Sequence, residues 1–140
     1  MSRIFWDTNL FIYLFEDAGE RATRVASLRQ RMLERNDQLY TSTLTLGEVL
    51  VKPLERGDEG LRERYETALS QAVTLIPFDR EAGRLYARIR QDRGIRAPDV
   101  LQLACAATVR TDLFITNDER LSRCLVPGIQ FITSLDHSPI

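Results

Sequence analysis

The sequence predicts a three-layer α/β/α fold with a mostly parallel central sheet. Short apolar runs of strand length alternate with longer segments whose apolar residues recur at helical spacing, and turn or capping residues separate them. Strands that alternate with helices favour parallel pairing, because each helix returns the chain to the start of the next strand. With 140 residues, 44% of them hydrophobic, we expect a single domain over 1–140.

In the first half of the chain, acidic, amide and glycine residues bound the expected elements. The apolar run at 3–6 has strand length, and Asp7-Thr8-Asn9 ends it with a turn into a helix. A later apolar stripe at helical spacing ends at Asn36-Asp37. The expected order is a strand at 3–6, a helix with a stripe over 22–32, a strand at 39–42, a helix at 44–54, a turn at 57–60 and a helix at 61–72.

The second half repeats this alternation. Residues 73–78 have strand character, and Asp79 is placed to cap a helix that Gly94 ends. The next helix begins at Ala97-Pro98-Asp99 and is apolar nearly all round, so we expect it to be central and buried. The remaining expected elements are a strand at 113–116, a short helix capped by Asn117-Asp118, a strand at 131–133 and a loose tail to 140.

Composition argues against several kinds of chemistry. Cys105 and Cys124 form no CxxC motif and His137 is the only histidine, so we expect neither a zinc site nor a histidine-based catalytic pair. No run of about 18 apolar residues is present, and Asp7 comes too early for a signal peptide, so we expect a cytoplasmic protein. The net charge of −1 argues against extensive coating of nucleic acid but allows a local basic rim.

Four acids stand at positions where a charge needs an explanation. Asp7 and Asp118 each follow a predicted strand directly, and they lie at one end of the sheet if these two strands are neighbours. Asp99 falls in the first turn of the most buried helix. Glu48 interrupts an otherwise apolar helix, where a charge must be paired or must bind something.

Each acid also has an ordinary structural explanation. Asp7 and Asp118 suit helix N-caps. Asp99 suits the positive end of a helix dipole, and Glu48 suits a solvent-facing helix edge. Clustered carboxylates repel one another, however, and the chain offers a single lysine, so the four together indicate a shared cation. Oxygen ligands favour Mg²⁺ or Mn²⁺, and such a cation suits phosphodiester hydrolysis.

Polar neighbours of the acids can orient ligands or water, and arginines can hold phosphate. The neighbours are Thr8, Asn9, Thr116 and Asn117, with turn or cap roles as the alternative for the two asparagines. The arginines expected near the substrate are Arg80, Arg84, Arg88, Arg93 and Arg96. A solvated helix face with salt bridges to Glu81 and Asp92 is the alternative for these arginines.

Four motifs occur in a fixed order along the chain. They are Asp7-Thr8-Asn9, Thr45-Leu46-Gly47-Glu48-Val49, Pro98-Asp99-Val100-Leu101-Gln102-Leu103-Ala104 and Thr116-Asn117-Asp118. From Ile4 to about Thr133, the chain resembles the PIN-domain family, and within it the VapC-like toxins of type II toxin–antitoxin pairs. The resemblance implies a PIN-like fold and an Mg²⁺- or Mn²⁺-dependent endoribonuclease.

The resemblance also assigns residues and partners. Asp7, Glu48, Asp99 and Asp118 match the family's acidic quartet, and Thr8 and Thr116 match the hydroxyl positions beside the first and last acids. It further implies an RNA substrate, a cognate antitoxin protein and a homodimer.

Other function classes have sequence features that test them. A haloacid-dehalogenase-like phosphatase would need a second acid where Asn9 stands, and a lysine in a context that Lys52 lacks. A P-loop enzyme would need a glycine-rich loop that ends in Lys-Ser/Thr, and none is present. A non-catalytic PIN-like module that binds RNA or protein stays open. Metal-dependent cleavage that disappears in Asp7→Asn while the fold persists would decide against it.

Overall fold

A five-stranded sheet forms the centre of the computed structural model, which describes residues 1–16 and 19–140. Its strands are β1 (Arg3–Trp6), β2 (Gln38–Ser42), β3 (Thr74–Ile76), β4 (Leu113–Thr116) and β5 (Phe131–Ser134). The order across the sheet is β3-β2-β1-β4-β5, and every pairing is parallel. The predicted α/β class is confirmed. The first and fourth strands are neighbours, which is the condition under which Asp7 and Asp118 lie at one end of the sheet.

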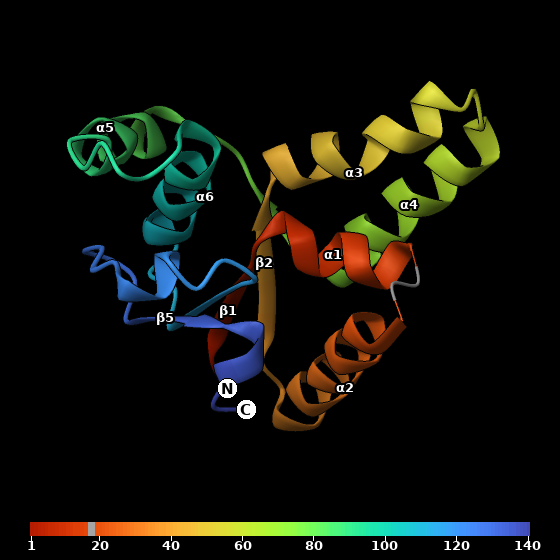
Figure 1. Cartoon of the computed structure of the whole chain (residues 1–140), viewed down its shortest axis with the longest axis horizontal. Helices are drawn as coiled ribbons and strands as arrows, with labels where there is room; N and C mark the ends of the chain where they lie inside the picture. Colours follow the sequence, from red (N-terminus) through yellow and green to blue (C-terminus); the bar gives the residue numbers. More distant parts are fainter. Residues whose placement is uncertain (17–18) are drawn as a thin grey trace.

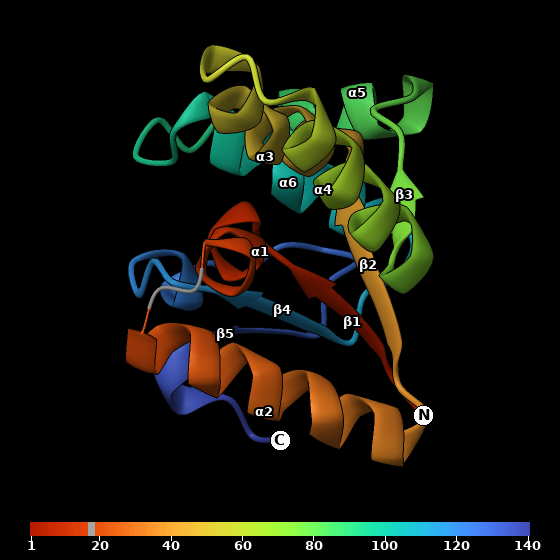
Figure 2. The ribbon, with the colours of Figure 1, turned by 90° about the vertical axis from the view of Figure 1, so that its right-hand side faces the viewer.

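Helices cover both faces of this sheet, which confirms the three layers (Figures 1 and 2). They are α1 (Thr8–Phe15), α2 (Gly19–Arg35), α3 (Thr43–Glu55), α4 (Glu59–Ala72), α5 (Arg80–Ile89) and α6 (Ala97–Thr108), with the short 3₁₀ helices η1 (Leu121–Arg123) and η2 (Leu135–His137). Over the described residues, no helix combines the length and the apolar character that a membrane crossing requires.

The pleat of the strands divides the core into two halves. Ile4 and Trp6 of β1 pack on the side of α1 and α2, together with Leu28 and other buried residues of those helices. Phe5 faces the opposite side, where it stacks on Phe114 of β4 with ring centroids 5.1 Å apart and packs with residues of α5 and α6. Side chains alternate between faces along a strand, so strands buried on both faces read as continuous apolar runs.

Several expected boundaries are wrong in detail. The strand expected at 73–78 shortens to Thr74–Ile76, and Gly60 lies in the first turn of α4 rather than in the turn before it. Helix α5 ends at Ile89, before Gly94. The tail is not loose, because η2 follows β5 directly and Leu135 is buried.

The short helix after β4 also begins later than expected. Its first residue is Leu121, and Arg120 rather than Asn117 or Asp118 occupies the N-cap position. The reason is local: Oδ1 of Asp118 accepts a hydrogen bond from the backbone N–H of Arg120, which forms a turn across these residues.

The strand order places a functional site at one edge of the sheet. Chain connections run in opposite directions from β1 on its two sides, and in open parallel sheets ligands bind outside the carboxyl ends of the strands at such a switch point. Asp7 directly follows β1, and its N–H donates to the carbonyl of Ile115 in β4 at 3.0 Å. The first candidate acid is therefore fixed where β1 and β4 end.

Candidate functional site

Asp7 is the most buried of the candidate acids, with 7% of its surface exposed. It caps α1, and its Oδ1 accepts the backbone N–H of Thr8 at 2.8 Å. Its Oδ2 accepts the hydroxyl of Thr116 at 2.8 Å, across the boundary between β1 and β4. Both carboxylate oxygens are thus held in place by residues that directly follow or end a strand.

The charge of Asp7 is unfavourable in this environment. The pKa of Asp7 is raised from 3.8 to about 6, chiefly by burial. The hydrogen bonds from Thr116 and Thr8 lower this pKa, and the negative charges of Asp99 and Glu48 raise it. The two hydrogen bonds therefore do not offset the effect of burial and of the two neighbouring carboxylates on the charge of Asp7. A buried carboxylate beside other carboxylates is stabilised by a cation.

Glu48 is joined to Asp7 through Thr8. The side chain of Glu48 lies on α3 at an exposed position, and its Oε1 accepts the hydroxyl of Thr8 at 2.8 Å. The same hydroxyl oxygen lies 2.9 Å from Oγ1 of Thr45, one turn earlier on α3. Thr8 therefore connects the N-terminus of α1 to the first turns of α3.

Behind the acids, a buried amide organises these hydroxyls, and sequence reasoning missed it. Gln102 on α6 is 2% exposed, and its Nε2 donates to the hydroxyl oxygens of Thr8 and Thr45 at 2.9 Å each. Its Oε1 accepts the hydroxyl of Ser42 at 2.5 Å. The available signal was that Gln102 is the one amide in an otherwise apolar buried helix, because buried polar groups need partners.

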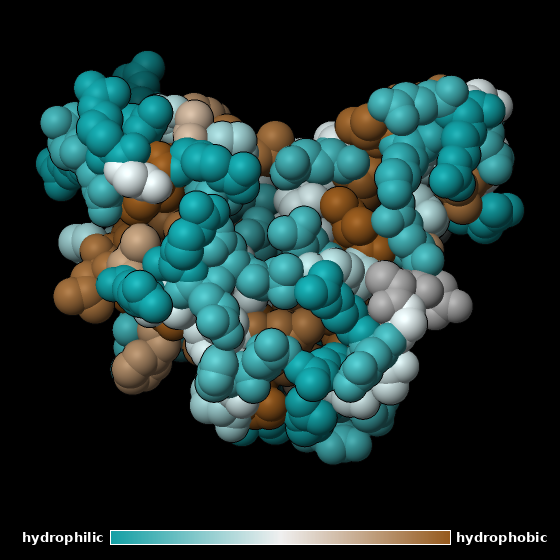
Figure 3. Space-filling model, viewed as in Figure 1, coloured by the Kyte–Doolittle hydropathy of each residue, from teal (hydrophilic) through white to brown (hydrophobic). Residues whose placement is uncertain are grey.

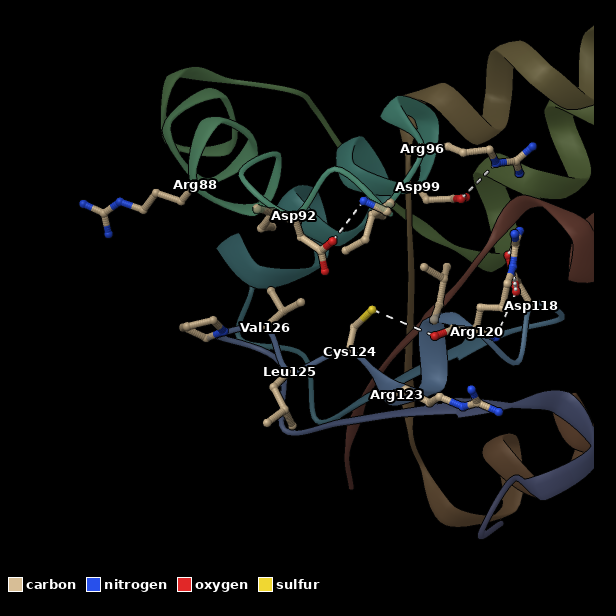
Figure 4. Close-up of a pocket in the computed structure, with 15 residues that line it drawn as sticks. Arg88, Asp92, Arg96, Asp99, Asp118, Arg120, Arg123, Cys124, Leu125 and Val126 are labelled. Atoms are coloured by element: carbon tan, nitrogen blue, oxygen red, sulfur yellow. Dashed lines mark hydrogen bonds and ion pairs between the residues drawn. The ribbon is translucent and has the colours of Figure 1, made fainter.

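Asp99 and Asp118 each pair with an arginine (Figure 4). Asp99 lies in the first turn of α6, and its Oδ2 is 3.4 Å from Nε of Arg96. Asp118 receives a bidentate contact from Arg120, with Nε 3.1 Å from Oδ1 and Nη2 2.9 Å from Oδ2. These hydrogen bonds from Arg120, chiefly those of its side chain, hold the pKa of Asp118 below its usual range.

Hydrogen bonds also connect Asp118 to Asp7. The N–H of Asp118 donates to Oγ1 of Thr116 at 3.1 Å, and that hydroxyl in turn donates to Asp7. The two predicted hydroxyl neighbours, Thr8 and Thr116, therefore contact the acids directly. Asn9 is exposed, and the side-chain hydrogen bonds found over 1–16 and 19–140 include none from Asn9 or Asn117.

The carboxylate oxygens suit a hard divalent cation, although the acids are not arranged as a complete coordination shell. All four candidates offer carboxylate oxygens, the ligands that Mg²⁺ and Mn²⁺ prefer. Among the residues that the structure describes, no group of three or more His, Cys, Asp or Glu side chains is placed to hold a metal ion together. The arginine partners of Asp99 and Asp118 occupy oxygens that a cation would need.

A cavity of about 730 Å³ opens beside these two acids (Figure 4). Of the five arginines expected near the substrate, Arg88 and Arg96 line it, whereas the other three are not among its lining residues. No ion pair of the described residues joins the expected arginines to Glu81 or Asp92. Arg120 and Arg123 also line the cavity, and sequence reasoning did not single them out.

Comparison with known proteins identifies related folds. The PIN domain family model matches residues 4–124. A chain in the crystal structure of VapBC2 from Rickettsia felis bound to a DNA fragment from their promoter matches with a TM-score of 0.75 and 17% identity, over 94% of this chain and 98% of that chain. A search of curated proteins gave no match.

Two further solved structures have the same fold. A chain of a toxin–antitoxin complex from Klebsiella pneumoniae matches with a TM-score of 0.66 and 25% identity, over 90% of this chain and 94% of that chain. A chain of DNA-bound VapBC from Salmonella typhimurium matches with a TM-score of 0.66 and 21% identity, over 96% of this chain and 99% of that chain.

Proposed function

The chain belongs to the PIN-domain family, and we propose that it is a metal-dependent endoribonuclease, the toxin of a type II toxin–antitoxin pair. Two independent observations support the proposal. Its motifs resemble those of VapC-like toxins, and the solved structures of the same fold include a toxin–antitoxin complex from Klebsiella pneumoniae. The domain proposed to carry this activity is the whole chain, 1–140.

The observation that carries the proposal is the unfavourable carboxylate of Asp7. It is buried at the switch point of the sheet, close enough to Asp99 and Glu48 for their charges to raise its pKa. Such an arrangement opposes the stability of the metal-free fold. A carboxylate cluster that costs stability at a switch point is expected where a cation and a substrate bind.

In this proposal Asp7, Asp99 and Asp118 hold Mg²⁺ or Mn²⁺. A bound cation of this kind supplies charge stabilisation on the scissile phosphate and lowers the pKa of a bound water. Glu48 completes the set or orients the attacking water, and Thr8 holds its carboxylate in place. Thr116 donates to one oxygen of Asp7 and would orient this carboxylate for a bound cation.

The partners of the proposed enzyme are an RNA substrate and a cognate antitoxin protein. The Klebsiella pneumoniae relative is described as a toxin–antitoxin complex, which supports an antitoxin partner for this chain. The homodimer and the cytoplasmic location stay predictions of the family resemblance.

Cleavage of total RNA and of a transfer-RNA panel by the purified chain tests the proposal. We expect discrete products with Mn²⁺ or Mg²⁺, and none with chelator or with Asp7→Asn. Absence of cleavage by a folded protein that binds Mn²⁺ would contradict the proposal and favour a PIN-like binding module.

Asp99→Asn separates an enzymatic role from a structural one. Because the substitution relieves carboxylate repulsion, we expect cleavage to fall at least about a hundredfold while the unfolding midpoint stays level or rises. The control is Asp58→Asn, which makes the same change at an exposed helix cap on α4. Loss of folding in Asp99→Asn would show that this acid is structural.

A further inference from the structure

The cavity beside Asp99 and Asp118 has two chemically different parts. Its acid-containing end holds the arginine pairs of Asp99 and Asp118, and its remaining wall is largely apolar, with Ile89, Leu125 and Val126 among the lining residues. Leu125 is 97% exposed, whereas Val126 is buried, so this wall offers mainly the side chain of Leu125 to solvent. The volume of about 730 Å³ falls in the range of sites that bind small organic groups.

Arg120 is the group that spans from the cavity to the acid cluster. Figure 4 shows its guanidinium on Asp118, whereas the guanidinium of Arg123, three residues later at the end of η1, points away from the acids. The side chain of Arg120 is 77% exposed, and an ion pair that is so exposed contributes little to stability. The contact is therefore easily exchanged for another partner.

A cation at the acid cluster would compete with Arg120 for the same oxygens. Both oxygens of Asp118 are engaged by the guanidinium, and the charge of Asp99 also acts on Arg120. Two positive groups cannot share one carboxylate in this geometry without repelling each other. Binding of the cation therefore weakens the contact of Arg120 with Asp118 and favours release of the guanidinium toward the cavity.

We infer that this cavity binds the RNA nucleotide next to the scissile phosphate, an inference that rests on the proposed ribonuclease function. When the cation binds, Arg120 leaves Asp118 and binds the phosphate of that nucleotide instead. Arginine is suited to this exchange, because the fork that grips a carboxylate also grips a phosphate. The apolar wall at Leu125 and Val126 then faces the sugar and base. In the cation-free protein, the same arginine neutralises the charge of Asp118.

The first test is the affinity for Mn²⁺ without any RNA, measured by the paramagnetic resonance signal of free Mn²⁺. Because Arg120→Gln removes the competitor, we expect Mn²⁺ to bind on the order of fivefold more tightly. Arg123→Gln, which makes the same charge change three residues later, should alter the affinity less than about twofold. Equal tightening by both variants, or none by Arg120→Gln, would overturn the exchange.

The second test is binding of a short fluorescent single-stranded RNA in Ca²⁺, with the integrity of the RNA checked on a gel. We expect Arg120→Gln to weaken binding on the order of tenfold, because a charge-assisted phosphate contact is lost. Leu125→Ser should weaken RNA binding and leave the Mn²⁺ affinity unchanged, and Arg64→Gln on α4 should change neither. RNA binding that is unaffected by Arg120→Gln and Leu125→Ser would overturn the assignment of the cavity.

These results separate the inference from the proposed function. Wild-type protein that binds Mn²⁺ but cleaves no RNA contradicts the ribonuclease, whereas the Mn²⁺ affinity of Arg120→Gln still decides the exchange.

Discussion

At the residue scale, Asp7 combines a structural and a chemical task. Its backbone N–H donates to Ile115 of β4, which extends the pairing of β1 with β4, and one carboxylate oxygen caps α1. Its charge nevertheless opposes folding in the metal-free protein, because burial and two neighbouring carboxylates raise its pKa to about 6. An asparagine would keep the cap without this penalty. An aspartate at this position is therefore explained by binding of a cation rather than by a contribution to stability.

The raised pKa of Asp7 predicts a pH-dependent difference between wild type and Asp7→Asn in chelator. The pKa lies above its ordinary value, so the stability present below about pH 4 is lost as the pH rises through about 6. The full loss corresponds to about 3 kcal/mol. We would measure urea unfolding at about pH 4.5 and about pH 7.5. The free energy of unfolding of Asp7→Asn should rise relative to that of wild type at the higher pH. A constant difference would contradict this account of Asp7.

Gln102 offers a second residue-scale prediction. Gln102→Ala leaves Thr8, Thr45 and Ser42 without their shared partner in a dry interior. We expect the free energy of unfolding to fall by about 2 to 4 kcal/mol, from a lost buried network and a cavity. Gln91→Ala, at an exposed position, should cost less than about 0.5 kcal/mol. Urea denaturation measures both, and an equal cost for the two would show that the network is not important to the fold.

Sequence reasoning could propose the acids but not their pairings. Asp7 and Asp118 are recognisable because each follows an apolar run that ends as a strand. The bond from Gln102 to Thr8 joins residues 94 positions apart, and no local pattern encodes it. The pairing of Arg120 with Asp118 is local, but arginines are so frequent in this chain that spacing alone did not distinguish it.

At the scale of elements, strands were predictable where both faces are buried. β1 and β4 each contain three consecutive buried apolar residues and are followed by polar residues, and their bounds match the prediction. At the sheet edge, β3 is shorter than expected because Pro77 has no N–H to continue the ladder. The helix η2 was missed because it depends on contacts such as that between Ser134 and His137 rather than on periodicity.

The loop after η1 contains a glycine that the packing of α6 requires. Gly128 has a φ of +98°, and a Cβ built there would lie 2.9 Å from the carbonyl oxygen of Ala107. We therefore expect Gly128→Ala to destabilise the fold by about 2 kcal/mol or more. Gly83→Ala, in α5 with open space around it, should be neutral or stabilising by up to about 1 kcal/mol. Thermal unfolding compares the two, and a neutral Gly128→Ala would show that the loop adapts.

At the scale of the whole molecule, the fold gathers charges that the composition does not reveal. The net charge of −1 is nearly balanced, yet the candidate acids collect where β1 and β4 end. Figure 3 shows this face of the molecule hollowed between the lobe of α5 and α6 and the arm of α3 and α4. Elements from both sides contribute acids, with Glu48 on α3 and Asp99 on α6. The site therefore depends on the relative placement of the two groups of helices.

The most direct test of a shared cation site is the anomalous diffraction of crystals grown with Mn²⁺. We predict one or two peaks at the carboxyl ends of β1 and β4, about 2.2 Å from oxygens of Asp7, Asp99 and Asp118. The guanidinium of Arg120 should have left Asp118 in that structure. Mn²⁺ bound elsewhere, or no peak among these three acids at saturating Mn²⁺, would contradict the account.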